Sequence, residues 1–197
     1  MNKKVSEAQS RIIDIIEGIK KDYYGREWNK FYGDTVCRIF MDFISKEFNS
    51  QHRIVGPNAY ISGFPTEFDI LIVDAFAEPI GFTHSFRPQE VKCGIESKAH
   101  GIFGGRNDIE NNVGKIKDSF LKVNKEHSHI LFLYLTYEEV AYPKKESSIN
   151  YLRETSRVLA PYEVFCLKDS RSDKIILGEW ERMLRFLRKH LYEQNVA

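Results

Sequence analysis

Apolar residues recur at helical spacing in five stretches of this chain. Near the amino end, Ser6 and Gln9 have the spacing of a capping box, and isoleucines follow on one helical face through Ile19. The same spacing predicts a helix over Thr35 to Phe48, after glycines at positions 25 and 33. The other predicted helices are one capped by Asn107 or Asp108 that carries Val113, Ile116, Phe120 and Val123, one near Ser148 to Val158, and a last one with Trp180, Leu184, Leu187 and Leu191 on one face.

Shorter runs rich in β-branched and aromatic residues lie between the predicted helices. The segment Arg53 to Ser62 is β-like with an interruption at residues 56–58, and Glu67 to Phe76 and Gln89 to Lys98 follow as two further strands. His129 to Thr136 is almost entirely apolar, which is typical of a central strand buried on both faces. Glu163 to Leu167 predicts a short strand near the carboxyl end.

The order of these elements predicts one α/β domain over residues 1–197, with a mixed β-sheet flanked by helices. Three consecutive strands with short connections favour antiparallel pairing in the first half of the sheet. An all-parallel doubly wound sheet is the less favoured alternative. No repeat, low-complexity tract or linker divides the chain.

Composition narrows the class of protein. With 197 residues and 42% hydrophobic content, the chain can bury a full core. Its formal net charge of +1 means that any nucleic-acid binding must come from local patches, a dimer cleft or a partner. Three isolated cysteines without C-x-x-C spacing argue against a zinc site or a disulfide framework and fit a reducing cytoplasm. Without a run of about 18 apolar residues, we expect neither a secreted nor a membrane-spanning protein.

One carboxylate falls inside an apolar β-run. Asp69 lies within the predicted strand that runs through Ile70-Leu71-Ile72-Val73, where an unpaired charge costs several kcal/mol. The nearest candidate partners are Glu96 and Lys98, at the end of the next predicted strand. Their two side chains share a face because β side chains alternate with a period of two. This arrangement suits a metal-dependent phosphodiesterase.

These residues resemble the motif of a known superfamily. A helix, then an Asp in the second strand, then Glu-x-Lys ending the third is similar to the PD-(D/E)xK nucleases, which include many type II restriction enzymes. The resemblance covers about residues 34–136 and implies a restriction-endonuclease-like αβββαβ core, here with extra terminal helices. Residues 61–63, 67–74 and 88–98 also resemble an uncharacterised bacterial branch. Phe68 stands where the Pro of the motif's name would be.

The triplet alone has little weight. With 28 acidic residues and 17 lysines among 197 residues, chance supplies roughly two acid-x-Lys triplets. Two are present. The other is Glu90-Val91-Lys92, at the start of the same predicted strand. We favour Glu96-Ser97-Lys98, because it precedes a glycine-containing loop that could admit a phosphate.

The resemblance also implies roles for the residues. Mg²⁺, with Mn²⁺ as a possible substitute, prefers oxygen ligands and keeps several waters, so Asp69 and Glu96 would hold it together with the backbone carbonyl of Ser97. Lys98 would favour hydroxide near the phosphate and stabilise the charge that develops there. Asp34, on the helix before the sheet, is the candidate for an additional supporting acid.

Plainer interpretations stand beside these. Asp69 and Lys98 could form a structural ion pair, Glu67 and Asp74 suit exposed strand ends, and His100 suits a solvent-facing loop. The basic residues of the middle and last helices suit solvated faces, and Trp180 suits the core.

The sequence therefore predicts a metal-dependent DNA endonuclease of the restriction or genome-defence kind, acting on double-stranded DNA. Twofold symmetry matches a duplex site, so we expect a homodimer, with a cognate methyltransferase or partner subunit as a possible companion. The alternatives are a non-catalytic nucleic-acid-binding or assembly protein on a nuclease fold, and an α/β domain that binds another protein through its terminal helices.

Overall fold

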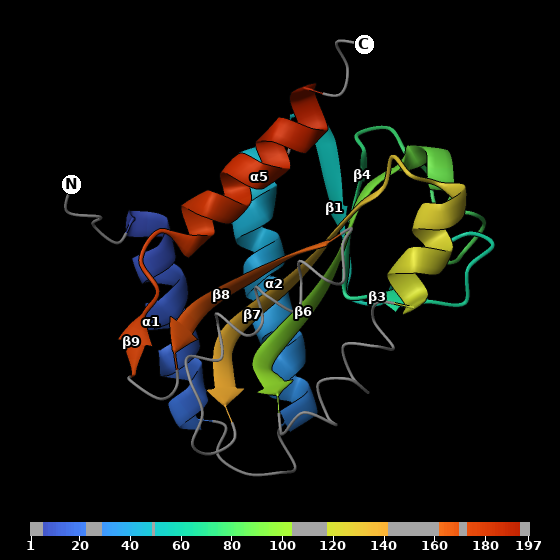
Figure 1. Ribbon diagram of the computed structural model, residues 1–197. Coiled ribbons are helices and arrows are strands. Elements are labelled where there is room, and N and C mark those ends of the chain that lie inside the picture. Colours follow the sequence, from blue (N-terminus) through green and yellow to red (C-terminus); the bar gives the residue numbers. More distant parts are fainter. Residues whose placement is uncertain are drawn as a thin grey trace.

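The computed structural model describes residues 6–22, 29–48, 50–103, 118–141, 162–169 and 173–193. Its centre is a six-stranded sheet in the order β1-β4-β6-β7-β8-β9 (Figure 1). The strands are β1 (His52–Val55), β4 (Ile70–Asp74), β6 (Val91–Phe103), β7 (Leu131–Ala141), β8 (Tyr162–Asp169) and β9 (Lys174–Ile175).

The sheet is mixed, as the sequence predicts. β1, β4 and β6 pair antiparallel in succession, whereas β6, β7 and β8 pair parallel. The short β9 returns antiparallel along β8. The apolar run at residues 129–136 supplies the start of β7, which lies between two neighbours and is buried on both faces.

A second, smaller sheet lies beside the first. It contains β3 (Glu67–Phe68), β2 (Ala59–Ile61) and β5 (Ser85–Phe86), in that order. β2 pairs antiparallel with β3 and parallel with β5. A single-turn helix, η2 (Pro88–Glu90), then leads into β6.

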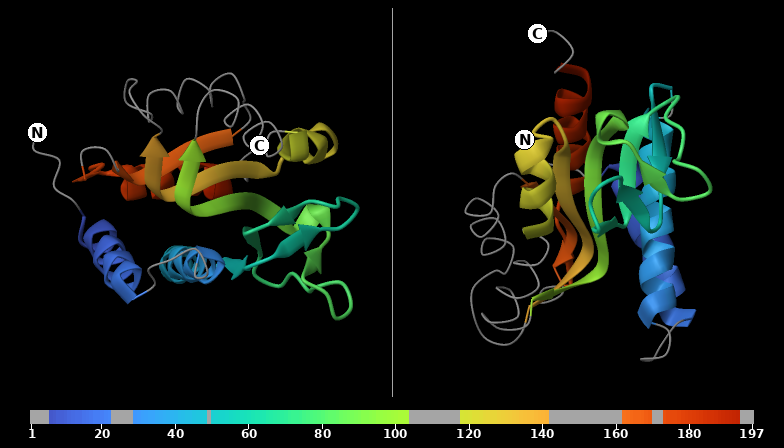
Figure 2. Two further views of the ribbon diagram at one scale, coloured as in Figure 1. Left: turned by 90° about the horizontal axis from the view of Figure 1, so that it is seen from below. Right: turned by 90° about the vertical axis from the view of Figure 1, so that its right-hand side faces the viewer.

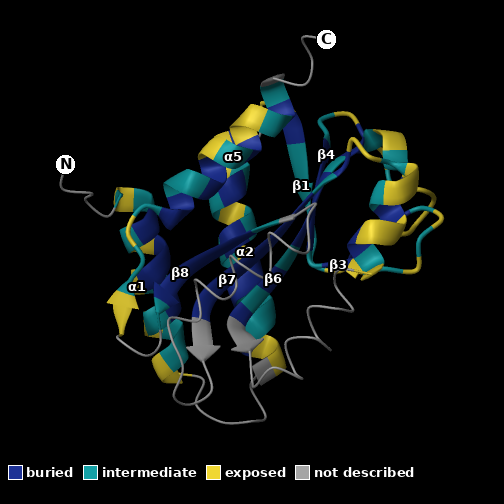
Figure 3. Cartoon of the chain, in the orientation of Figure 1, coloured by how far each residue is buried: buried dark blue, intermediate teal, exposed yellow. Residues whose placement is uncertain are grey.

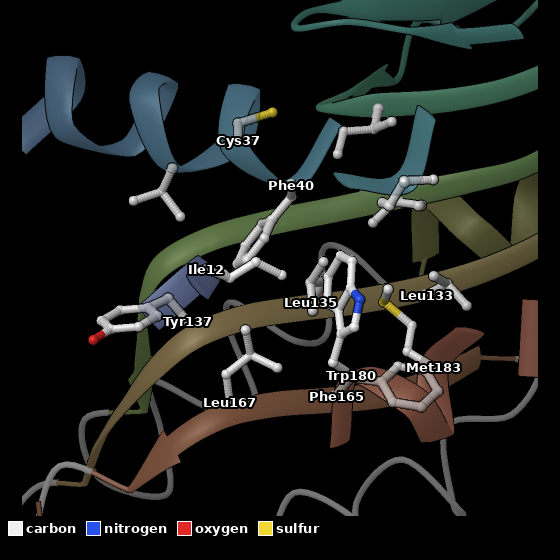
Figure 4. Close-up of a cluster of buried hydrophobic side chains, with 14 of the residues drawn as sticks. Ile12, Cys37, Phe40, Leu133, Leu135, Tyr137, Phe165, Leu167, Trp180 and Met183 are labelled. Atoms are coloured by element: carbon white, nitrogen blue, oxygen red, sulfur yellow. The ribbon is translucent and has the colours of Figure 1, made fainter. Parts of the chain in front are cut away.

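Three helices share one face of the large sheet: α1 (Glu7–Asp22), α2 (Asn29–Phe48) and α5 (Glu179–Glu193). Their apolar sides meet the sheet in one core, part of which is drawn in Figure 4 around Phe40, Leu135 and Trp180. Figure 2 shows α1 and α2 together on one side of the sheet. A helix over residues 118–126 packs against the other face, with the small sheet, in a second core.

The start of α1 explains how the amino-terminal helix is attached. The backbone N–H of Gln9 donates to Ser6 Oγ at 3.1 Å, so Ser6 caps the helix as expected. The Gln9 side chain is turned away from the cap and donates to the carbonyl of Ile176 at 2.7 Å. The capping box is therefore one-sided, because the buried Gln9 serves the contact between α1 and the segment before α5.

Three predicted boundaries were wrong. α2 begins at Asn29, so Gly33 lies inside the helix instead of before it. The run from 67 to 76 is two strands, because β3 and β4 belong to different sheets. β6 continues through Phe103 instead of ending at Lys98, because its pairing with β7 extends to that residue. The predicted helix at 148–158 and the cap at 107 or 108 lie outside the described residues.

Burial follows this layering. In Figure 3, β7 and β8 are dark blue along much of their length, and exposed residues lie on the outer sides of the helices. None of the helices in the described ranges has both the length and the apolar character needed to cross a bilayer.

Candidate functional site

Asp69 lies at the joint between the two sheets. It separates β3, which ends at Phe68, from β4, which begins at Ile70. The chain changes sheet at this residue, so Asp69 is at a break in the apolar run and its side chain is about one quarter exposed. A carboxylate here can reach both the neighbouring strand and the solvent.

β6 is no longer paired with β4 beyond the position of Asp69. The pairing of β4 with β6 ends at Ile70 and Ile95, and β6 continues beyond it with β7 on its other side. Glu96 and Lys98 follow Ile95 on one face of β6 because they are two residues apart. The acidic and basic side chains thus lie in the interior of a long strand but beyond the end of its neighbour.

The side chains converge on one amine. Lys98 Nζ lies 3.0 Å from Asp69 Oδ2, contacts Glu96 Oε1, and donates to the Ser97 carbonyl oxygen at 3.1 Å. The Ser97 amide donates to Asp69 Oδ2 at 2.7 Å. An ammonium group has three donors, and here they meet three oxygens from Asp69, Glu96 and Ser97. The structure thus brings together Asp69, Glu96, Ser97 and Lys98, four of the five site residues that the sequence singled out.

Comparison with solved structures agrees with this architecture. NucC from P. aeruginosa ATCC27853 in its cAAA-bound form has a TM-score of 0.62 at 12% identity, over 94% of this chain and 92% of that one. NucC from E. coli MS115-1 gives 0.62 at 11% identity in the cAAA-bound form, over 98% of each chain, and 0.55 at 12% identity in the apo form, over 93% and 92%. No protein-family model and no curated protein matches the sequence.

The fold of this chain is the one that the NucC structures have. At such low identity, the likeness extends to the fold alone. The roles of the individual residues therefore depend on the geometry of this chain.

The local environment changes the acidity of the cluster. Burial raises the pKa of the Glu96 carboxyl above its ordinary value, and the nearby Asp69 carboxylate raises it further, against the opposing effect of Lys98. Burial by itself would lower the pKa of the Lys98 amine, but Glu96 and Asp69 outweigh it, so this pKa is raised. Lys98 is therefore a cation at neutral pH, and it separates two carboxylates that would otherwise repel each other.

The donor set fits a hard divalent cation. Two carboxylates and a backbone carbonyl already surround one positive charge, the Lys98 ammonium. Mg²⁺ takes oxygen ligands of this kind and leaves further positions to water or phosphate. Across the described ranges, no group of three or more His, Cys, Asp or Glu side chains could hold a metal ion.

Within the part of the chain that the structure describes, Asp34 makes no hydrogen bond or ion pair with this cluster. It is partly exposed on α2, one turn before Cys37. Cys37 Sγ donates weakly to the Asp69 carbonyl oxygen at 3.7 Å. Burial raises the pKa of the Cys37 thiol to about 12, and the charges of Asp69 and Asp34 add to the rise. Asp34 is thus within electrostatic reach of a residue that touches Asp69.

Sequence reasoning missed a second acid beside the cluster. Glu67 was interpreted as an exposed strand-end charge, and it is exposed, but its carboxylate accepts a hydrogen bond from Tyr60. Its charge also helps to raise the pKa of Glu96. Glu67 is two residues before Asp69, and this spacing is only a weak sign that the two side chains lie close together. The hydrophobic pattern does not show that β3 ends just before Asp69 and that β4 begins just after it.

The competing triplet lies elsewhere. Glu90 is in η2 and pairs with Arg87, while Lys92 pairs with Asp74 at 3.0 Å. Asp74 is the last residue of β4, at the opposite end from Asp69. Glu90 and Lys92 therefore belong to surface ion pairs away from the cluster.

Three residues of the last helix, Trp180, Arg182 and Arg188, make contacts that stabilise the fold. Trp180 is fully buried in the core, as expected. Arg182 pairs with Glu179 and Glu163, and Arg188 pairs with Glu47. These contacts explain the two arginines without a nucleic-acid partner.

Proposed function

We propose that this protein is a metal-dependent endodeoxyribonuclease that hydrolyses phosphodiester bonds in genome defence, with a type II restriction enzyme as the concrete form. The observation that supports it is the meeting of oxygens from Asp69, Glu96 and Ser97 with the Lys98 amine at one partly exposed point. The nuclease fold adds to this support.

Asp69, Glu96 and the Ser97 carbonyl are the residues that would hold Mg²⁺, with Mn²⁺ as a substitute. When bound, such an ion polarises the phosphate and helps to generate the attacking hydroxide. The reaction joins a water oxygen to phosphorus, breaks the bond from phosphorus to the leaving sugar oxygen, and ends with a proton on that oxygen.

Lys98 contributes charge in this proposal. Its pKa is raised, so it remains protonated at neutral pH and is a poor proton acceptor. A cation beside the phosphate stabilises the negative charge that grows in the transition state. Its removal should therefore lower kcat more than it weakens DNA binding.

The proposed substrate is double-stranded DNA in the cytoplasm. A homodimer would supply two sites related by twofold symmetry, one for each strand. A cognate methyltransferase or partner subunit would complete a restriction system. A near-neutral net charge is compatible with both arrangements, since affinity for DNA would then come from local surface.

The test is cleavage of supercoiled plasmid and phage DNA by the purified protein with magnesium, with manganese and with chelator. Wild type is compared with Asp69→Ala and Lys98→Ala. Lys46→Ala is the control, because Lys46 is exposed and contacts its helix neighbours Asp42 and Phe43. We expect metal-dependent fragments from wild type and the control, and none from the other two. Equal cutting by Lys98→Ala would contradict the proposal, and DNA binding without cutting by any form would favour a non-catalytic nucleic-acid-binding protein.

A further inference from the structure

The two strands that carry the acids touch at a glycine and an aromatic ring. Gly94 lies on β6, two residues before Glu96 and therefore on the same face as Glu96 and Lys98. A Cβ on Gly94 would lie 2.8 Å and 2.9 Å from two ring atoms of Phe68 and 3.1 Å from the Phe132 ring. Phe68 immediately precedes Asp69. Only a hydrogen at position 94 lets the Phe68 ring lie against the strand.

The Phe68 ring has no room to retreat. It is fully buried and stacks on both Phe120 and Phe132, with ring centroids 5.8 Å apart in each pair. Phe120 and Phe132 stack on each other at 4.5 Å. A methyl group at position 94 must therefore move either the β6 backbone or Phe68, because interiors are packed too densely to absorb it.

A second close approach holds Asp69 from another side. A Cβ on Gly56 would lie 2.3 Å from the Asp69 carbonyl oxygen, which also contacts Cys37 Sγ. The Asp69 backbone is thus fixed by Gly56, and its preceding residue is fixed by Gly94. The carboxylate meets the Ser97 amide at 2.7 Å as a result.

We propose that the contact of Phe68 with Gly94 is the positioning element that sets the Asp69 carboxylate against Glu96 and Lys98. The proposal rests on the proposed nuclease function. Phe68 and Gly94 touch no reacting group and act through Asp69. Phe68 thus belongs to the second core and also positions Asp69 in this proposal.

The test is a mutant cycle with Gly94→Ala, Phe68→Leu and the double variant, each assayed for kcat and KM on plasmid and for the folded fraction by thermal denaturation. Gly94→Ala should lower kcat by about a hundredfold, the loss expected for a shift of about 1 Å at a reacting group. Phe68→Leu, which loosens the contact without adding atoms, should lower kcat by about tenfold. The double variant should match Phe68→Leu, because the smaller side chain makes room for the methyl group.

The matched control is Gly18→Ala on α1, where an added Cβ meets nothing within 4 Å. It should leave kcat unchanged. Folded Gly94→Ala with wild-type kcat, or losses in the cycle that simply multiply, would overturn the proposal. If Gly94→Ala does not fold, Phe68→Leu decides, since an unchanged kcat in that variant would also overturn it.

A crystal structure of Gly94→Ala separates this proposal from the proposed function. We expect the Asp69 carboxylate to lie beyond hydrogen-bonding distance of the Ser97 amide. A displaced Asp69 in a protein whose wild type cuts no DNA would uphold the positioning and reject the nuclease. An undisplaced Asp69 would reject the positioning, whatever the wild type does.

Discussion

Lys98 and Lys168 both pair with two carboxylates, but their side chains differ in exposure and in the elements that supply the acids. Each contacts two carboxylates: Lys98 meets Asp69 and Glu96, and Lys168 meets Glu17 and Asp173 at 2.6 Å and 2.7 Å. The Lys98 side chain is 38% exposed, whereas that of Lys168 is 9% exposed. A larger part of the Lys98 side chain than of the Lys168 side chain therefore faces solvent.

The origin of the acids separates the two clusters further. Asp69 and Glu96 come from adjacent parts of the sheet, next to the Ser97 carbonyl. Glu17 comes from α1 and also accepts a hydrogen bond from the Tyr137 phenol on β7. Both acids at Lys98 thus come from the sheet region, whereas at Lys168 the Glu17 carboxylate joins α1 to the sheet. In the proposed function, the ion pairs of Lys98 serve catalysis, whereas those of Lys168 attach α1 to the sheet.

The largest expected effect is at Asp69. Asp69→Asn removes one of the two carboxylates that would hold the metal, and we expect the cleavage rate to fall by about a thousandfold or more, about 4 kcal/mol of barrier. Binding of Mn²⁺, followed by electron paramagnetic resonance, should weaken in parallel while the melting temperature changes little.

Asp42→Asn is the control for that change, because Asp42 is exposed on α2 and pairs with Lys46. It should leave both cleavage and Mn²⁺ binding as in wild type. Unaltered Mn²⁺ binding in Asp69→Asn would show that the metal, if used, binds elsewhere.

Glu17→Gln addresses the other cluster. Removing the charge weakens the contacts to Lys168 and Tyr137, and the loss of such a hydrogen bond to a charged group costs about 1–3 kcal/mol of unfolding free energy. Chemical denaturation measures this loss. Asp14→Asn, at an exposed position of the same helix, should change stability by much less. A catalytic defect per folded molecule in Glu17→Gln would remove the distinction between the clusters.

Asp34→Asn should have a smaller effect than Asp69→Asn. Asp34 acts electrostatically on Cys37, which touches Asp69, so we expect the cleavage rate to fall by up to about tenfold, or about 1.4 kcal/mol. Single-turnover cleavage at saturating metal measures it. A loss as large as that of Asp69→Asn would make Asp34 a ligand in its own right.

The smallest expected effect is a pH dependence of the helix attachment. Burial would raise the pKa of Glu17, but the hydrogen bonds from Lys168 and Tyr137 outweigh it, so the pKa lies below its ordinary value of 4.5. A lowered folded-state pKa stabilises the protein above the ordinary value, and this contribution is lost as the pH falls through the folded-state pKa. The difference in melting temperature between wild type and Glu17→Gln should therefore shrink below about pH 4.5. A constant difference down to pH 3 would exclude this linkage.

The sequence predicted the architecture because its signals are strong and local. The mixed sheet, the central apolar strand and the grouping of Asp69 with Glu96 and Lys98 were all accessible from periodicity and a spaced motif. The roles of these residues in catalysis stay predictions. What sequence could not predict depends on contacts between distant segments.

The joint at Asp69 illustrates the limit. Residues 68–73 are all apolar except Asp69. Periodicity therefore cannot show that the chain changes sheet after Phe68. The fit of Phe68 on Gly94 and the approach of Gly56 to Asp69 are tertiary contacts between segments 26 and 13 residues apart in sequence (94 − 68 and 69 − 56). Gly33 led to the prediction of a break before α2, because glycine is common in turns. It lies inside the helix, since a glycine is tolerated in a helix that packing stabilises.

The most direct test exchanges the two amines for methionine, in Lys98→Met and Lys168→Met, and measures both the cleavage rate per folded molecule and the melting temperature. The account predicts that Lys98→Met loses cleavage by at least about a hundredfold per folded molecule. It predicts that Lys168→Met melts several degrees lower, on the order of 2–8 °C, and cuts normally while folded. Cleavage that survives in Lys98→Met, or is lost in folded Lys168→Met, would contradict it.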